Sequence, residues 1–597
     1  MFKRALAWYS GLLAMARVWL AQPSVRRALR WASRVALLAY GLAVLLILAL
    51  RYLVLPQVAS HQLEIERAAT RALGMPVRIE RIDAGWKGLN PRLQLGGVRL
   101  IDSRGAPALT FERVEGVLSW HSLWRFKPIL ALLVIDRPVL NVRRDSDGRI
   151  TVAGINAEGE SDPQLARWIF EQRRIRIRNA IVVWEDAKRG APPLILEDLQ
   201  FSLDNRGSRH RFGLSAVPPE HLAARIDLRG DVHGDLPEEW EQLSGQVFAE
   251  LDYADLAGWR AWIDYPLAID QGRGALRVWA RWQEGRGSLT ADLALEEVQV
   301  RFGRQLPLLD LRSMRGRLQG HYRQDDWRLA GVRFELSTRS GIRLPPSDFN
   351  VEWRQGRKGI GGEASFSFVD LETLGRLAEY LPLDARSREL LATHQPRGRL
   401  IDLAARWQMD GERMDRYALS GRFESMGLRA AGYFPGGSGL TGAIDADEQG
   451  GWIQIDSRTS SLDLPSIFPE PQLNFSELRG KASWKRVGQG LEARLERLVF
   501  AGPDAAGSAS GNYRNNGDGP GVIDLTARVE RAEGKAIWRY MPHAVNQDTR
   551  DWLKQGITGG SASDASLVLK GDLRHFPFAD KRQGEFRILA KARDVRI

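Results

Sequence analysis

The stretch from Gly274 to Leu295 reads GALRVWARWQEGRGSLTADLAL and decides the fold class. In its first half, Leu276, Val278, Ala280 and Trp282 alternate with Arg277, Trp279 and Arg281. In its second half, Leu289, Ala291, Leu293 and Leu295 alternate with Thr290, Asp292 and Ala294. A period of two places alternate side chains on opposite faces of a β-strand. The stretch therefore predicts antiparallel strands that are apolar on one face and charged on the other.

The same pattern recurs along the chain after about residue 76. Ala330, Val332, Phe334 and Leu336 alternate with Gly331, Arg333 and Glu335, and turn signals such as Asp147-Gly148 and Asn205-Arg206-Gly207 separate the runs. Because 597 residues exceed one ordinary domain, we expect a multidomain, repetitive or very elongated β protein. The fold class that we predict is mainly β: an N-terminal transmembrane helix followed by a long curled antiparallel sheet with an open groove.

Three segments interrupt the strands in a similar way. Each has an acidic start, a helix-like stretch, a proline, glycines and a long strand: Leu251 to Trp282, Val369 to Trp407, and Val529 to Lys570. We interpret them as copies of one unit in a repeat architecture, with chance similarity as the alternative. The predicted organisation is a basic tail (1–34), a transmembrane helix (35–55), an N-terminal β region with a short leading helix (56–250), and groove repeats at 251–368, 369–528 and 529–597. The last repeat ends inside an alternating run, which suggests a truncated sheet.

The apolar run from Val35 to Leu55 predicts the membrane anchor. Its 21 residues contain one charge, that of Arg51, and a helix of that length spans about 31 Å, close to the hydrocarbon core of a bilayer. Arg51 lies near one end, where its side chain can reach the headgroups, and Pro56 is expected to end the helix. A cleaved signal peptide is the alternative, but the run is longer than a typical signal sequence. The predicted anchor residues are Val35, Leu38, Leu42, Leu46, Leu50, Arg51 and Leu55.

The net charge of +12 is concentrated before the body of the protein. Up to Leu55 there are eight Lys and Arg residues and no Asp or Glu, so 12 − 8 = 4 net charges belong to the rest of the chain. This distribution predicts a cytoplasmic N-terminus by the positive-inside rule and a periplasmic body. It does not provide the clustered basic surface of a nucleic-acid-binding protein, so we expect no nucleic-acid partner.

We find no catalytic or metal-binding motif. The chain has no cysteine, and its nine histidines lack metal-ligand spacing. Asp145 and Asp147 faintly resemble a calcium loop, but Asn156 occupies the position of the required glutamate, so a hairpin turn is the better interpretation. The sequence predicts a protein that is not an enzyme and holds no cofactor or metal.

Several motifs resemble the AsmA-like superfamily and its large YhdP branch. They include RALGMPVRIERIDAGWKGLNPRLQLGGVRLID (Arg71 to Asp102), IDRPVLNVRRDSDGR (Ile135 to Arg149), PRGRLIDLAARW (Pro396 to Trp407) and GDLRHFPFAD (Gly571 to Asp580), and RGAPPLIL (Arg189 to Leu196) and NRGSRHRFGL (Asn205 to Leu214) also match. The resemblance implies an elongated, curled sheet whose apolar groove carries phospholipid from the inner to the outer membrane, in proteins considerably longer than this chain.

The partners implied are phospholipid, the inner membrane and an outer-membrane or periplasmic protein, in support of the outer-membrane barrier. The residues that we predict to line the groove are Leu93, Leu95, Leu118, Leu276, Val278, Ala280, Trp282, Leu289, Ala291, Leu293, Val332 and Phe334. A closed sandwich core is the structural alternative. An assembly factor or chaperone for outer-membrane β-barrel clients, like the role proposed for the related TamB-type proteins, is the functional alternative. An envelope hydrolase would need a triad or metal set that the sequence does not contain.

Overall fold

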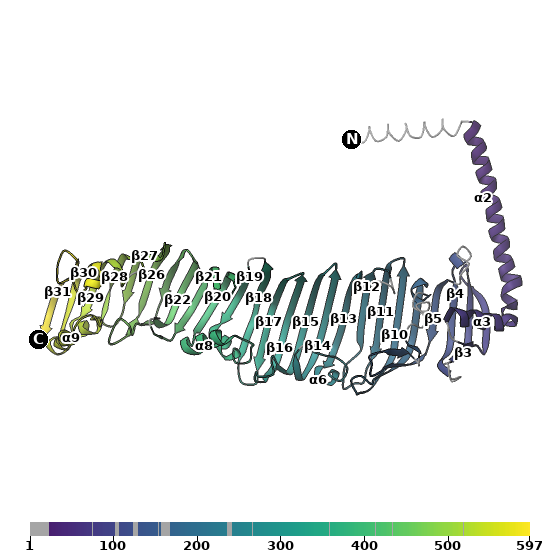
Figure 1. The fold of residues 1–597 in the computed structure, drawn as a ribbon, viewed down its shortest axis with the longest axis horizontal. Helices are drawn as coiled ribbons and strands as arrows, with labels where there is room; N and C mark the ends of the chain where they lie inside the picture. The colour runs from purple at the N-terminus through teal and green to yellow at the C-terminus, as the bar shows by residue number, and fades with distance from the viewer. Residues whose placement is uncertain are drawn as a thin grey trace. The chain divides into compact units, whose positions relative to one another are not determined.

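The computed structural model describes residues 23–73, 76–101, 107–122, 129–152, 155–156, 168–235, 242–265, 267–356, 359–411, 413–432, 434–517 and 519–596. It is dominated by strands, and few helices accompany them (Figure 1). The chain divides into two compact units, one formed by residues 1–217 and 233–241 and the other by residues 218–232 and 242–597. The predicted tail lies partly outside the described residues, which begin at Pro23.

The first unit begins with helices and continues with short and long strands. Its elements are α2 (Pro23–Ala49), η1 (Leu50–Val54), η2 (Leu55–His61), α3 (Gln62–Leu73), β1 (Val77–Arg78), β2 (Arg81–Lys87), β3 (Asn90–Ile101), β4 (Pro107–Leu118), β5 (Leu130–Asp136), β6 (Val139–Arg144), β7 (Ile150–Val152), β8 (Ile155–Asn156), β9 (Arg174–Asp186), β10 (Ala191–Arg206) and β11 (Arg209–Val217). Most neighbours pair antiparallel, but β9 runs parallel to both β5 and β6. The predicted antiparallel sheet therefore contains a local parallel connection.

The N-terminal helix is long and apolar enough to cross a membrane, and it is the one such helix among the described residues. Val35, Leu38, Leu42 and Leu46 on α2 are all exposed, as expected for lipid-facing side chains. The prediction that Pro56 ends the helix is wrong. The backbone continues through the π-helical turn η1 and the 3-10 helix η2, where Pro56 occupies one of the first positions and needs no N–H partner.

The last residues of the predicted anchor lie in a different environment from the exposed side chains of α2. Leu50 and Arg51 lie in η1, and the Arg51 guanidinium lies 5.9 Å from the centre of the Tyr52 ring. Leu55 is buried rather than exposed. The last residue of the predicted anchor therefore packs against protein.

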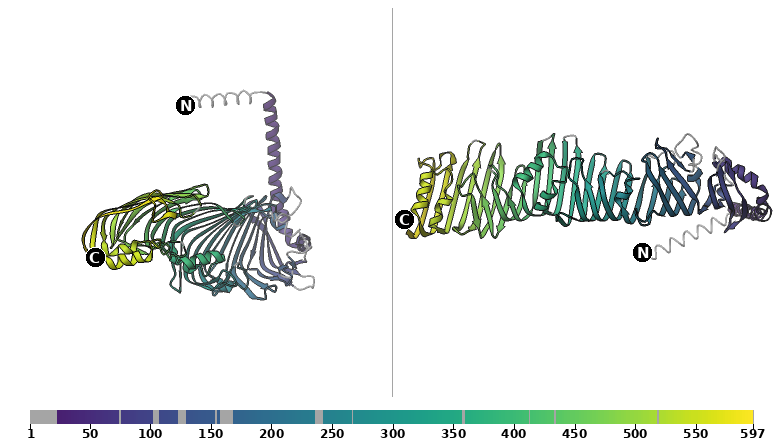
Figure 2. Two further views of the ribbon diagram at one scale, coloured as in Figure 1. Left: turned by 60° about the vertical axis from the view of Figure 1, so that its left-hand side comes forward. Right: turned by 90° about the horizontal axis from the view of Figure 1, so that it is seen from below.

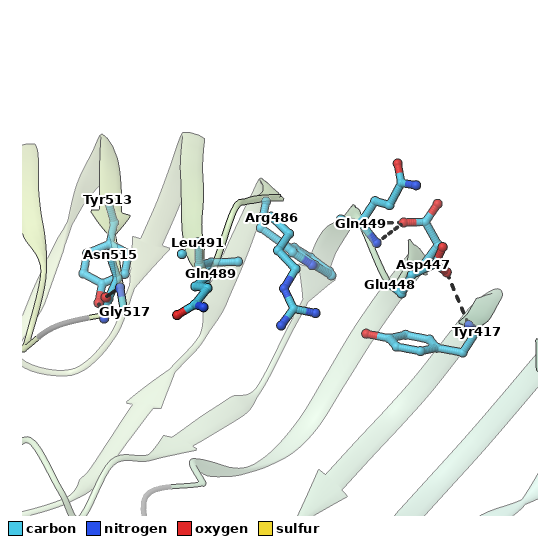
Figure 3. A pocket seen from close by; sticks show the side chains of 13 residues that line it. Tyr417, Asp447, Glu448, Gln449, Arg486, Gln489, Leu491, Tyr513, Asn515 and Gly517 are labelled. Carbon is cyan, nitrogen blue, oxygen red and sulfur yellow. Dashed lines mark hydrogen bonds between the residues drawn. The ribbon is translucent and has the colours of Figure 1, made fainter. Parts of the chain in front are cut away.

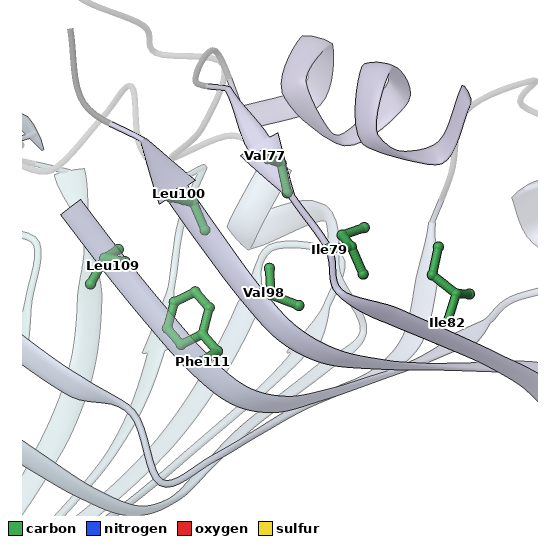
Figure 4. Close-up of a cluster of buried hydrophobic side chains, with 7 residues drawn as sticks. All are labelled: Val77, Ile79, Ile82, Val98, Leu100, Leu109 and Phe111. Atoms are coloured by element: carbon green, nitrogen blue, oxygen red, sulfur yellow. The ribbon is translucent and has the colours of Figure 1, made fainter. Parts of the chain in front are cut away.

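Helix α3 covers the first strands of the first unit. Val77, Ile79, Ile82, Val98, Leu100, Leu109 and Phe111 form a buried cluster, shown in Figure 4. Val58, Ile65 and Ala69 pack against it from the helical segment, and the buried carboxylate of Glu66 accepts a hydrogen bond from the backbone N–H of Ile79 at 2.8 Å. The amphipathic helix that precedes these strands in the sequence thus covers their apolar face.

A buried polar network holds β10 and β11 of the same unit. The Asn205 side chain donates to the carbonyl of Gln172 at 2.8 Å, and its Oδ1 lies 2.8 Å from Nδ1 of His210. The Gln172 side chain is itself fully buried and accepts from the N–H of Leu130 at 2.8 Å. Because buried polar groups are costly when unpaired, each member of the network depends on the others.

This network predicts an acid-sensitive stability. Burial lowers the pKa of His210 below its usual value of 6.5, so the fold favours the neutral ring. The stability that this preference contributes is present above pH 6.5 and is lost as the pH falls through the lower native pKa. We expect His210→Gln to reduce the fall in melting temperature between pH of about 8 and about 5, whereas replacing the exposed His321 by Gln should not. Equal acid sensitivity in all three proteins would contradict this role.

The second unit is a long succession of antiparallel strands (Figure 2). Its elements are β12 (Ile226–His233), β13 (Ser244–Asp255), α6 (Leu256–Trp259), β14 (Ala268–Gln283), β15 (Arg286–Arg301), β16 (Leu309–Arg323), β17 (Asp326–Thr338), β18 (Arg343–Gly356), β19 (Gly359–Asp370), α7 (Leu371–Leu377), α8 (Ala385–His394), β20 (Arg397–Asp410), β21 (Arg413–Leu428), β22 (Gly436–Asp447), β23 (Gly450–Ser457), β24 (Ser460–Asp463), β25 (Gln472–Phe475), β26 (Glu477–Val487), β27 (Gly490–Ala501), β28 (Ala505–Asn515), β29 (Val522–Glu533), η4 (Gly534–Tyr540), α9 (Gln547–Gly556), β30 (Gly559–Asp572), η5 (Leu573–His575) and β31 (Gly584–Arg596).

Apart from η5, which follows β30, the helices of this unit follow strands that end at one and the same edge, which we call the helix edge. Helix α6 follows β13, α7 and α8 follow β19, and η4 and α9 follow β29, as Figure 1 shows for α6, α8 and α9. These are the segments in which the sequence predicted helices. Asp255, Asp370 and Asn546 cap helix N-termini by accepting backbone N–H groups. Whether the three segments are copies of one repeat stays a prediction.

At the opposite edge, tight turns connect the strands, and we call it the tight-turn edge. Residues 284–285 join β14 to β15, 324–325 join β16 to β17, and 488–489 join β26 to β27. Glu284 and Gly285 both have positive φ angles, which matches the right-handed twist of a two-residue hairpin. Compact turns thus predominate at one edge of the second unit, and the insertions with α6, with α7 and α8, and with η4 and α9 lie at the other.

Candidate functional site

The strand register in the second unit brings uncharged residues into continuous rows on one face, which we call the apolar face. The first row takes one residue from each strand from β13 to β23 and from β26 to β31: Val247, Ala280, Leu289, Gly320, Leu329, Val351, Ala364, Ala405, Leu419, Ala446, Gly451, Trp484, Ala493, Tyr513, Ile523, Gly571 and Gly584. Directly opposite residues of antiparallel strands lie on the same face. The row is therefore an uncharged path across the strands of the unit.

A second row runs beside the first, two residues along each strand. It contains Ala249, Val278, Ala291, Leu318, Gly331, Phe349, Phe366 and Leu403 from β13 to β20, and Gly421, Ile444, Ile453, Ala482, Leu495, Gly511, Leu525, Leu569 and Phe586 from β21 to β31. No member carries a charge. Two parallel rows make the apolar face a continuous surface.

Aromatic rings on this face lie over glycines of neighbouring strands. A Cβ atom added to Gly331 would come within 2.2 Å of the Phe349 ring, and one added to Gly362 would come within 2.2 Å of the Trp407 ring. Phe423 covers Gly442 in the same way. Because the glycines make room for them, these large side chains lie low along the sheet.

The opposite face of the same strands is charged and held by cross-strand ion pairs. Arg277 pairs with Glu250 at 2.6 Å, and Arg317 pairs with Asp292 at 2.6 Å. The hydrogen bond from Arg317 lowers the pKa of the Asp292 carboxyl below its usual range. These groups are exposed, so each pair contributes little to stability, but together they keep that face in water.

The apolar face is open at one edge and closed at the other. Near the tight-turn edge, Leu289 is 49% exposed and Leu329 is 41% exposed, whereas near the helix edge Leu295 is 5% exposed and Leu311 is 2% exposed. Leu256, Leu377 and Tyr380, from the helical insertions, pack against the closed part. The two alternatives left by the sequence, an open trough and a closed core, thus each describe a different part of the face.

Most of the predicted groove residues of the second unit lie where the alternation places them. Leu276, Val278, Ala280, Trp282, Leu289, Ala291 and Leu293 share the apolar face. Phe334 lies there as well, and its ring contacts that of Phe349 with 5.9 Å between centroids. That these residues contact lipid stays a prediction.

Val332 is an exception, and its predicted place is wrong. It lies opposite Arg317, on the charged face, and is 39% exposed. The reason is a β-bulge at Arg333, which has a φ of 48° and whose N–H bonds to Asp348. A bulge adds one residue to the strand, so the alternation that follows it is shifted by one.

The predicted residues of the first unit share one face of β3 and β4. Leu93 and Leu95 lie opposite Gly116 and Val114, and Leu118 follows on the same face. Leu95 packs against the buried cluster beneath α3. It therefore belongs to the edge of a small core.

The sequence interpretation missed the side chains that line a pocket at the tight-turn edge. The pocket has a volume of about 390 Å³ and is shown in Figure 3. Its lining includes the aromatic rings of Tyr417, Trp484 and Tyr513, the guanidinium of Arg486, and the carboxylate of Glu448. These residues come from three strands (β21, β26 and β28) and one turn that are distant in sequence, so only the register brings them together. Among the described residues, no group of three or more His, Asp or Glu side chains could hold a metal ion.

Comparison with known proteins agrees with the resemblance seen in the motifs. A model of the family described as YhdP protein matches residues 15–597. The chain is 22% identical over 591 residues to the protein named intermembrane phospholipid transporter YhdP of Escherichia coli strain K12, a match that covers 93% of this chain and 44% of that protein. The chain thus spans less than half the length of this relative. No solved structure matches significantly. The sheet of the second unit is apolar along one face, and the family match runs from residue 15 to the last residue. The chain therefore belongs to the YhdP family.

Proposed function

We propose that this protein carries phospholipids between the inner and outer membranes along the apolar face of its sheet, and so supports the outer-membrane barrier. The observation that supports the proposal best is the pair of uncharged rows that crosses the strands from β13 to β31. Acyl chains can leave water only where apolar surface is continuous, because each charged interruption adds a desolvation cost. The relative named as an intermembrane phospholipid transporter makes phospholipid the expected cargo.

The alternative role as an assembly factor for β-barrel clients has less support. Strand addition to a client needs a free strand edge. Strands β14 to β22 are each paired on both sides. Clients would therefore find no free edge along this part of the unit.

Lipid binding is tested by native mass spectrometry of the purified body, residues 56–597, released from detergent. We expect adducts with the mass of intact phospholipid, since the open part of the apolar face needs an apolar cover. A matched protein with Leu289→Lys and Leu329→Lys, which places charges on two exposed positions of the first row, should lose most of these adducts. Equal adducts in both proteins, or none in the unmodified body, would contradict the proposal.

We also propose that the helix formed by α2 and η1 anchors the chain in the inner membrane, with the N-terminus cytoplasmic and the body periplasmic. The exposed apolar surface of α2 and the excess of basic residues before Val35 support this orientation. A reporter that is active only in the periplasm should be active when fused after Ile597 and inactive when fused before Pro23. The reverse pattern in well-expressed fusions would overturn the orientation.

A further inference from the structure

Aromatic residues line the apolar face at the tight-turn edge of the second unit. A row of directly opposed residues runs from β14 to β21 within two to five positions of the turns: Trp282, Gly287, Tyr322, Trp327, Trp353, Gly362, Trp407 and Tyr417. We call this the rim row. Trp484 on β26 and Tyr513 on β28, which belong to the first row, lie at a similar distance from their turns, which begin at residues 488 and 516.

The rim row is partly open to solvent. Trp327 is 57% exposed, Trp353 is 42% exposed, and the rings of Tyr322 and Trp327 lie 4.6 Å apart. Trp and Tyr combine an apolar ring with a polar N–H or O–H, and they are therefore enriched where hydrocarbon meets water. In the rim row, six of the eight residues are Trp or Tyr, and the row marks the line at which the apolar face meets solvent.

The helix edge of β15 and β16 is built differently. There the face ends in the buried cluster of Leu295, Val298, Val300, Leu309 and Leu311, covered by side chains of the helical insertions. A polar headgroup at this edge would have to displace a packed core. The two edges therefore differ in the part of an amphipathic molecule that each can accept.

The length of a strand fits one acyl chain laid along it. From Gly287 in the rim row to Leu295 in the closed cluster, eight residues span about 27 Å. One leaflet of a bilayer has a hydrocarbon thickness of about 15 Å. A chain laid along the strands from the rim row thus ends before or at the covered cluster.

The pocket at the tight-turn edge adds charged groups just beyond this boundary. Arg486 follows Trp484 on the same face, and no ion pair of its guanidinium is found among the described residues. In Figure 3 its side chain extends from the strand end between Gln449 and Gln489. The pocket also contains Asp447, whose Oδ1 accepts two backbone N–H groups of its own turn, and Glu448. One guanidinium beside two carboxylates matches a zwitterionic headgroup, with phosphate at Arg486 and an ammonium group at Glu448.

We propose that phospholipids lie on the second unit in one orientation, with zwitterionic headgroups along the rim row and at the Arg486 pocket, and with acyl chains directed toward the helix edge. This inference rests on the proposed lipid-carrying function. It assigns the tight-turn edge as the headgroup side of the path and predicts that lipids do not turn end for end on the protein.

Two photoreactive phosphatidylethanolamine probes test the orientation, one with a diazirine near the headgroup and one with a diazirine at the acyl terminus. After irradiation with the full chain, kept soluble in amphipol without detergent, crosslinked residues are mapped by peptide mass spectrometry. The headgroup probe should label residues at the tight-turn edge, such as those around residues 322–327 and 484–491, and the acyl probe should label residues nearer the helix edge. The same distribution for both probes, or the reverse one, would overturn the orientation. Absence of crosslinks from both probes would instead contradict the proposed function.

Two pairs of variants separate the rim row and the pocket from general packing. Trp353→Ala should reduce headgroup-probe labelling at the neighbouring turns by about threefold or more, because the interfacial ring is lost. Trp279→Ala, at a similarly exposed tryptophan on the charged face, should not reduce this labelling.

For the pocket, Arg486→Gln should reduce labelling of residues 484–491 by the headgroup probe. Arg494→Gln, on the charged face of the next strand, should not reduce it. Equal effects of the two tryptophan variants would contradict the role of the rim row, and equal effects of the two arginine variants would contradict the role of the pocket. A preference for an anionic phosphatidylglycerol probe over the zwitterionic probe would contradict the pairing of an ammonium group with Glu448.

Discussion

Val278→Asp is expected to reduce crosslinking of a photoreactive phospholipid to the body by about tenfold or more, while the protein stays folded. Val278 lies in the second uncharged row, directly opposite Ala249 and Ala291, with Leu276 and Ala280 beside it on the same face. A carboxylate at this point would have to lose its water whenever an acyl chain passed over it. Crosslink yield and thermal unfolding are measured on the same preparation.

The matched control for this prediction is Ser288→Asp. Ser288 lies opposite Arg281 and His321 on the charged face, where an added carboxylate stays hydrated beside a cation. We expect its crosslink yield to equal that of the unmodified protein. A folded Val278→Asp protein with undiminished crosslinking would show that lipid does not follow the rows. Gross unfolding of this variant would show that Val278 lies in a closed core.

The second large effect concerns stability. Leu311→Ala is expected to lower the free energy of unfolding by about 2–5 kcal/mol, because Leu311 is 2% exposed and lies in the cluster that the helical insertions cover. Leu289→Ala should cost about 1 kcal/mol or less, since Leu289 is 49% exposed on the same face. Denaturant unfolding of the two variants measures the difference directly.

This comparison uses the same substitution on neighbouring strands of one face. Equal losses of stability in the two variants would contradict the division of the apolar face into an open and a closed part. A small loss for Leu311→Ala alone would indicate that the helical insertions do not seal the helix edge. The lipid adducts of the two variants, measured at a temperature at which both are folded, separate stability from binding.

The sequence by itself determined the strands and the two-faced character of the sheet. The alternation from Gly274 to Leu295 needs no knowledge of partners, because the pleat of any strand separates odd from even residues. The acidic residues Asp255 and Asp370 likewise mark helix starts locally, since capping involves residues three positions apart. The apolar run from Val35 predicts the long apolar helix for the same reason of local composition.

The tertiary structure decided which residues share a face over many strands and how exposed each of them is. The bulge at Arg333 moves Val332 to the charged face, and alternation alone cannot locate it because the extra residue depends on how β17 pairs with β16. The rim row and the Arg486 pocket depend on the register of many strands, so their members are scattered along the chain. The opening at one edge and the cover at the other depend on which side chains of the insertions reach Leu295 and Leu311. Alternation fixes the face on which a side chain lies, whereas its solvent exposure is decided by residues distant in sequence that pack over it.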